Sequence, residues 1–191
     1  RSSMAGTIDR IPVRILDDNM DGKFTQKSSG IGGGDAIMIG SSVSAIPLKK
    51  VHRIGNHIYS LKVAGDGSSI DYERMDDIAI GQVKTPFSTS ALTSLVLVSK
   101  DSAFDVAADG KLGIPAGSYK LAYGTVSKSA AKLNFRPGMG TPEYNIQEGM
   151  VNTLRIGKPV RLDFQATYRG GKVGLSAGAV SVVGAGSEIY G

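Results

Sequence analysis

A short acidic segment near the start of the chain places oxygen-bearing side chains at alternate positions. If Asp17 is taken as the first position of a calcium loop, Asn19 stands at the third and Asp21 at the fifth. Gly22 follows at the sixth position, where such a loop turns sharply, and the backbone carbonyl of Lys23 supplies the seventh. The spacing therefore predicts a site for calcium, a hard cation that prefers oxygen ligands.

The closing ligand of this predicted site has to come from outside the usual loop. Ser28 stands at the twelfth position, where an EF-hand loop needs a bidentate Glu. Asp35, which follows a glycine-rich segment at residues 30–34, is the best candidate to replace it. The alternative is that the Asn and Asp-Gly residues simply form a polar hairpin turn that holds no metal.

The segment resembles the Asp-x-Asn-x-Asp-Gly calcium loops inserted between strands in secreted bacterial surface β-sandwich proteins. It is also similar to the first half of dockerin and thrombospondin-type repeats. The resemblance implies a structural calcium ion and an extracellular or cell-surface location. Extracellular modules bind calcium with dissociation constants of about 10⁻⁴ to 10⁻³ M, so millimolar calcium outside the cell can fill such a loop.

A second resemblance lies in the later half of the chain. The run Pro-Ala-Gly-Ser-Tyr-Lys-Leu at residues 115–121, preceded by the turn residues of 109–113, resembles the hairpin of transthyretin-like and carboxypeptidase-regulatory-like β-sandwiches. The resemblance implies a module that stabilises or displays another domain. Pro115 fixes φ and Gly117 relieves the turn. Tyr119, Leu121 and Tyr123 are therefore predicted to share one face of a strand.

Catalytic chemistry has few candidate residues. The chain has no Cys, and its two histidines, His52 and His57, are too few for a histidine-rich zinc site. Hydrolysis by a Ser-His-Asp arrangement would have to use one of them, and no neighbouring residues mark such a trio. We expect both to be ordinary surface or half-buried histidines.

The other acidic cluster comprises Asp71, Glu73, Asp76 and Asp77. Paired carboxylates can bind a second cation or hydrolyse glycosides, depending on their separation in space. Arg74 lies among them and turn residues precede them, so the sequence favours a solvated loop. The chain is therefore expected not to be an enzyme.

The elements that would position these residues are predicted to be short strands. Alternating or β-branched runs predict strands at residues 10–16, 36–39, 45–51, 57–64, 78–83, 92–99, 103–107, 117–126, 144–147, 151–156, 160–168, 172–176 and 179–183. The cleanest alternation is that of Val160, Leu162, Phe164, Ala166 and Tyr168, a pattern typical of a half-buried strand.

About a dozen strands in a chain of 191 residues predict a mainly-β fold, an antiparallel β-sandwich of two packed Ig-like or transthyretin-like units. Gly accounts for 26 residues, which suits many tight turns. We expect an N-terminal β unit with the calcium-like loop at 1–84 and a C-terminal β-sandwich unit at 85–191. A long crossover inside one larger sandwich would give the same pattern.

The charge pattern restricts the partners. The net charge of +5 favours an anionic cell-surface polymer or protein partner, but the basic residues are dispersed and lack interleaved aromatics, so no specific nucleic acid is expected. No transmembrane segment is predicted, because no apolar run approaches the length that spans a bilayer. Exposed edge strands predict a possible homo-oligomer.

These observations favour a non-enzymatic, extracytoplasmic structural or adhesion module that is stabilised by calcium. One alternative is a self-assembling surface-filament or layer subunit. A second is a carbohydrate-processing hydrolase.

Overall fold

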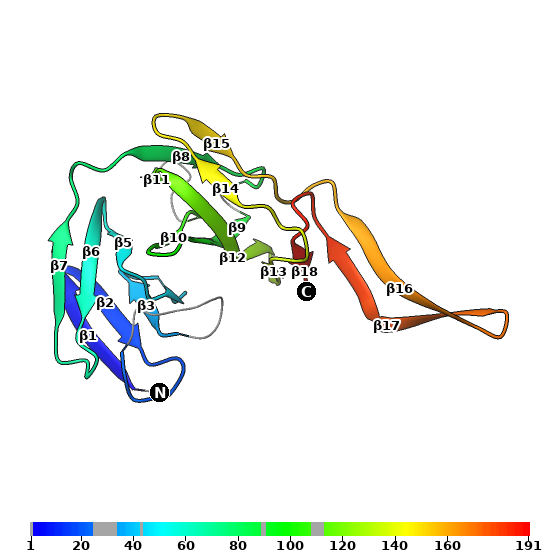
Figure 1. Ribbon diagram of the computed structural model, residues 1–191, viewed down its shortest axis with the longest axis horizontal. Coiled ribbons are helices and arrows are strands. Elements are labelled where there is room, and N and C mark those ends of the chain that lie inside the picture. Colours follow the sequence, from blue (N-terminus) through cyan, green and yellow to red (C-terminus); the bar gives the residue numbers. More distant parts are fainter. Residues whose placement is uncertain (1, 25–33, 43, 89–90, 108–112) are drawn as a thin grey trace.

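The computed structural model describes residues 2–24, 34–42, 44–88, 91–107 and 113–191, with the backbone alone at Ala177 and Ala179. Within these ranges the protein is mainly β, built from antiparallel sheets and without a helix, which confirms the predicted fold class. The ribbon has an irregular body and one long hairpin that leaves it (Figure 1).

The strands of the first half are β1 (Ser3–Ile8), β2 (Ile11–Leu16), β3 (Ala36–Ile39), β4 (Ile46–Pro47), β5 (Val51–Ile54), β6 (His57–Val63), β7 (Ile70–Arg74), β8 (Ile80–Lys84) and β9 (Leu92–Val98). Those of the second half are β10 (Ala103–Asp105), β11 (Ile114–Pro115), β12 (Gly117–Lys128), β13 (Ala131–Arg136), β14 (Tyr144–Ile146), β15 (Val151–Thr153), β16 (Arg161–Arg169), β17 (Lys172–Val183) and β18 (Ile189–Tyr190).

These strands form four sheets. One has the order β1-β2-β3-β4 and another the order β5-β6-β7, so the first half of the chain is built largely from neighbouring hairpins. The largest sheet runs β10-β9-β12-β13-β18-β17-β16, with β14 paired to β12. The fourth sheet, β11-β8-β15, contains a parallel pair, because β15 runs alongside β8 in the same direction.

Two hydrophobic cores share the central strand β9. Leu95 and Leu97 belong to the core that also contains residues of β8, β14 and β18, whereas Val96 belongs to the core formed with β1 to β6. This division follows from the pleat, because successive side chains of a strand point to opposite faces. The central sheet is thus covered on both faces, which explains the continuous apolar run of β9.

A bulge in β12 corrects one prediction from the sequence. Tyr119 and Leu121 pack in the core with β8 and β14, but Tyr123 packs against the other core, together with Ala122. The register with β9 shifts between Leu121 and Tyr123, and such an irregularity reverses the side-chain alternation. The prediction that Tyr119, Leu121 and Tyr123 share one face is therefore wrong.

The structure describes only part of the transthyretin-like stretch at residues 109–121. Its first residues, at 109–112, lie outside the described residues. The following β11 pairs with β8, and β12 pairs with β9, so these two strands join different sheets and do not pair with each other.

Strand pairing and core packing both cross the predicted division at residue 84. Strand β8, the last of the range 1–84, pairs with β11 and β15 of the range 85–191. Residues of β9, β10 and β12 in turn complete the core of the first sheets. The division into two units stays a prediction. Strand pairs and a hydrophobic core include residues from both sides of it.

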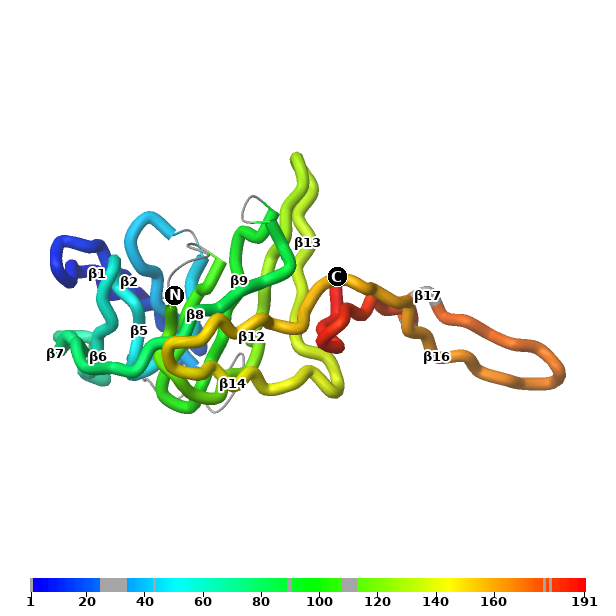
Figure 2. Tube along the Cα trace, turned by 90° about the horizontal axis from the view of Figure 1, so that it is seen from above, coloured from blue at the N-terminus to red at the C-terminus, as the bar shows by residue number. Residues whose placement is uncertain are grey.

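One element stands apart. Strands β16 and β17 form an antiparallel hairpin, residues 161–183, which we call the arm. Figures 1 and 2 show the arm in orange, projecting away from all other strands, with only its root joined to the body. The root is held by β18, which pairs with β17 through Val182 and Val183.

Candidate functional site

The predicted calcium loop closes on itself through hydrogen bonds. Asp17 is buried, and its carboxylate oxygens accept hydrogen bonds from the backbone amides of Asp21 and Gly22 at 3.2 and 3.1 Å. The Asn19 side-chain oxygen accepts from the Asp21 amide at 3.0 Å, and an Asp21 oxygen accepts from the Lys23 amide at 2.8 Å. The carboxylates of Asp17 and Asp21 are therefore already engaged by backbone donors.

Asp35 does lie beside this loop, as the sequence suggested. Its buried carboxylate accepts a hydrogen bond from the Asp18 amide at 3.2 Å. Ser28 and most of the glycine-rich segment lie outside the described residues. In the described part of the chain, no three His, Cys, Asp or Glu side chains are grouped so as to hold a metal ion. The arrangement suits a hydrogen-bonded turn, and calcium at Asp17, Asn19, Asp21, Lys23 and Asp35 stays a prediction.

The two histidines have different surroundings. His52 on β5 is fully buried, which contradicts the expected surface or half-buried position, and burial lowers its pKa to about 4. Its Nε2 lies 3.0 Å from the Lys49 carbonyl oxygen and 2.9 Å from the Lys49 amide nitrogen, and its Nδ1 makes no hydrogen bond within the described structure. His57 begins β6 and is half-buried, with its ring edge toward Tyr59.

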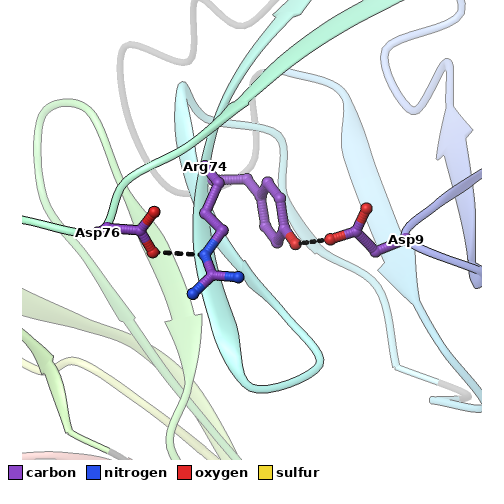
Figure 3. A network of polar contacts seen from close by, with 4 residues as sticks. Asp9, Arg74 and Asp76 are labelled. Atoms are coloured by element: carbon purple, nitrogen blue, oxygen red, sulfur yellow. Dashed lines mark hydrogen bonds and ion pairs between the residues drawn. The ribbon is translucent and has the colours of Figure 1, made fainter.

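The second acidic cluster is solvated, as the sequence predicted, but only Asp76 and Asp77 lie in a loop. Asp71 and Glu73 lie on β7 and are exposed, and Asp76 follows the strand. Arg74 forms an exposed ion pair with Asp76 (Figure 3), an interaction that contributes little in water. These residues lie at an exposed sheet edge.

A contact in the same region joins two sheets. The Tyr59 hydroxyl donates a hydrogen bond to Asp9 (Figure 3), and this bond raises the pKa of Tyr59. Asp9 and Arg10 connect β1 to β2 with φ values of 46° and 66°, as a type I′ turn requires. The contact therefore fixes this turn against β6 and has a structural role.

An open cleft of about 460 Å³ is lined by Ile11, Ile37, Ile46, Phe104, Arg53 and Asp105. The Asp105 carboxylate accepts hydrogen bonds from the Ser94 hydroxyl and from the amides of Leu95 and Ala107, at 2.8 to 3.0 Å. Asp105 is thus occupied in holding β9 to β10.

The most unusual surface is on the arm. Paired residues of β16 and β17 are Leu162 with Val182, Phe164 with Val180, Ala166 with Leu175 and Tyr168 with Val173. Directly opposite residues of an antiparallel pair share a face, and the four apolar positions of β16 alternate, so these side chains form an apolar stripe along the hairpin. A register shift between Phe164 and Ala166 interrupts the pairing in the middle of the stripe. Tyr168 is 77% exposed, Leu162 66% and Phe164 54%. The strand with the cleanest half-buried pattern in the sequence is thus solvent-exposed on its apolar face.

The opposite face of the arm is polar. Arg161, Asp163 and Arg169 alternate with the apolar residues of β16, and Lys172 stands opposite Arg169. The two-residue connection between the strands is Gly170-Gly171, with φ values of 59° and 76°. Both glycines adopt the left-handed conformation that a type I′ turn requires, so the sequence specifies a tight turn at the tip of the hairpin.

The arm is fixed at its root by a buried carboxylate. Glu188 is fully buried, and its Oε1 accepts hydrogen bonds from the Gly157 amide at 2.5 Å and the Tyr190 hydroxyl at 2.9 Å. Its Oε2 accepts from the Gly186 amide at 2.9 Å. A Cβ on Gly184 would lie 1.9 Å from Glu188 Oε1, so only glycine fits there. Glu188 joins the chain entering the arm to the chain leaving it.

Comparison with protein-family models, with curated proteins and with solved structures finds no match to this chain. Among its described residues, no helix is long and apolar enough to cross a membrane. The function therefore has to be argued from the geometry alone.

Proposed function

We propose that this chain is a non-enzymatic structural subunit that self-assembles, with a second copy covering the apolar face of the arm. The observation that carries the proposal is the exposure of a strand pair whose sequence is patterned for burial. Single exposed apolar residues are common on protein surfaces, whereas a contiguous apolar patch marks an interaction site.

The stability of the arm also supports a partner. An isolated two-stranded hairpin is marginally stable in water and needs a third strand or a packed face. Here β16 and β17 continue for 9 and 12 residues, and they depend on the body only at the root. A surface that covers the apolar stripe would supply the missing burial.

A second copy is the favoured occupant because the stripe carries no charge. The charged residues of β16 lie on the opposite face. Two copies with a net charge of +5 each can therefore meet through the stripe without placing like charges in contact. The self-assembling alternative, predicted from the sequence as a surface-filament or layer subunit, thus becomes the leading proposal in the form of association between copies.

Sedimentation equilibrium of the full chain tests this function. We expect reversible self-association at micromolar concentrations, weakened at least tenfold in Phe164→Ser, because burial of one aromatic side chain contributes about 2 kcal/mol. Thr167→Ser, on the polar face of the same strand, should associate like the unmodified chain. A monomer at all concentrations up to hundreds of micromolar would refute the proposal.

A calcium-stabilised, extracytoplasmic adhesion or binding module is the second candidate. It is supported by the Asp17 loop, where the buried carboxylates of Asp17 and Asp35 lie next to the same turn. Each carboxylate oxygen has two lone pairs, so an oxygen that accepts one amide can still bind a cation. Thermal melting with chelator and with millimolar calcium tests this candidate, as developed below.

The non-enzymatic part of the proposal is supported by the positions of the polar residues that a hydrolase would use. His52 is enclosed beside the Lys49 backbone, and Asp71 and Glu73 lie on an exposed strand. A hydrolytic enzyme needs a base oriented beside a nucleophile or paired carboxylates in a cleft. Measurable hydrolysis of a glycan or ester substrate that is lost on substituting either group would contradict this part.

A further inference from the structure

We infer that two copies pair through their arms, apolar face against apolar face, to form a two-fold symmetric, four-stranded sandwich. This inference rests on the proposed self-assembly and names the surface that each copy presents. It treats the arm as a self-complementary element that does not dock on the body of its neighbour.

The shape of the stripe favours another arm as its counterpart. The stripe is one hairpin wide, and its paired residues continue from Leu162 near the root to Tyr168 near the tip. A β-sandwich forms when two such faces interdigitate, with polar residues outward on each strand. The arm already has this division, because Arg161, Asp163 and Arg169 lie on the face away from the stripe.

The size of the stripe is adequate for a stable dimer. Its exposed members are Leu162, Phe164, Tyr168, Val173, Leu175 and Val180, and the exposed Val160 directly precedes β16. Half- to three-quarter-exposed side chains of these types together present roughly several hundred Å². A standard specific interface buries about 800 Å² on each partner. The two stripes are therefore close to the required area without any contribution from the bodies.

The arms must run antiparallel in this pairing. Packed sheets lie about 10 Å apart, whereas the body is much broader than the arm (Figures 1 and 2), so two bodies at the same end would collide. With the roots at opposite ends, the two bodies are separated by the length of the arms. The 9 residues of β16 span about 30 Å, which leaves room for this arrangement.

The absence of cysteine from the chain allows a direct test by cross-linking. Ala166 lies on the stripe near its middle, and Thr167, which pairs with Gly174, is the adjacent exposed residue on the polar face. Each would be replaced singly by Cys in the full-length chain and treated with a bismaleimide whose span matches the roughly 10 Å between packed sheets. We expect covalent dimer from Ala166→Cys and at least tenfold less from Thr167→Cys.

The outcomes separate this inference from the proposed function. Self-association without preferential cross-linking at Ala166→Cys would overturn the pairing of arms and leave an arm-to-body contact between copies. A monomer in sedimentation would overturn both. Equal cross-linking of the two variants would show a contact that does not distinguish the faces, and it would also overturn the inference.

Discussion

Removal of the buried carboxylate at the root of the arm should destabilise the protein strongly. In Glu188→Gln the side chain keeps its shape, but one carboxylate oxygen becomes an amide that donates hydrogen bonds. That amide must then face either the Gly186 amide or the pair formed by the Gly157 amide and the Tyr190 hydroxyl. At least one buried donor is left without an acceptor.

The magnitude follows from these contacts. An unsatisfied buried donor costs about 1 to 3 kcal/mol, and hydrogen bonds to a charged acceptor contribute about 1.5 to 3 kcal/mol each. We expect Glu188→Gln to lower the free energy of unfolding by about 2 to 4 kcal/mol, and Glu188→Ala by about 4 kcal/mol or more because all three donors lose their acceptor.

Urea denaturation followed by circular dichroism measures this loss. Glu148→Gln is the matched control, because Glu148 is an exposed carboxylate between β14 and β15. We expect the control to change the free energy of unfolding by less than about 0.5 kcal/mol. If Glu188→Gln also changed it by less than that amount, the carboxylate would not hold the root, and the reasoning would be refuted.

Three further predictions concern other parts of the body. His52 has a pKa of about 4 in the folded protein and about 6.5 when unfolded, so the unfolded chain binds the proton first as the pH falls. The contribution of this group to the free energy of unfolding should be complete above about pH 6.5 and should decrease by about 2 kcal/mol between pH 7 and pH 5. His52→Gln should reduce this dependence on pH in urea titrations carried out at several pH values. Asp21→Ala should lower the melting temperature more with calcium than with chelator, because it removes a metal ligand in addition to the acceptor of the Lys23 amide, and equal losses with chelator and with calcium would remove the metal from the account. Gly124→Ala should cost about 1 to 3 kcal/mol in denaturant titrations, because the added Cβ would lie 2.1 Å from the Phe135 ring, whereas Gly6→Ala, with no atom within 4 Å of the new Cβ, should be near neutral.

Much of the strand pattern could be predicted from the sequence. The alternation at 36–39 and the run at 92–99 correspond closely to β3 and β9, because side-chain patterning against a core is a local signal. Strand β1 was missed, since Ser, Ala and Gly dilute its alternation, and β13 was missed because most of its side chains are exposed. The pairing of β8 with β15 depends on residues about 70 positions apart, which local periodicity does not encode.

The candidate sites were harder to predict for a different reason. The alternation of β16 correctly indicated a strand with one apolar face, but periodicity cannot tell whether that face is covered by the same chain or by another. The role of Glu188 was also missed, because it depends on backbone amides at Gly157 and Gly186 that only the folded root brings together. The spacing of its residues was enough to locate the loop at Asp17, but it was not enough to identify the ligand of the loop.

Amide hydrogen exchange of the arm at low and high protein concentration tests the central claim most directly. An exposed hairpin opens easily and exchanges fast, whereas a covered hairpin is protected. The account predicts that exchange in β16 and β17 slows at least tenfold as the concentration rises through the association range, with no comparable change in β9. Exchange in the arm that is independent of concentration, while the protein associates, would show that another surface joins the copies and would contradict the account.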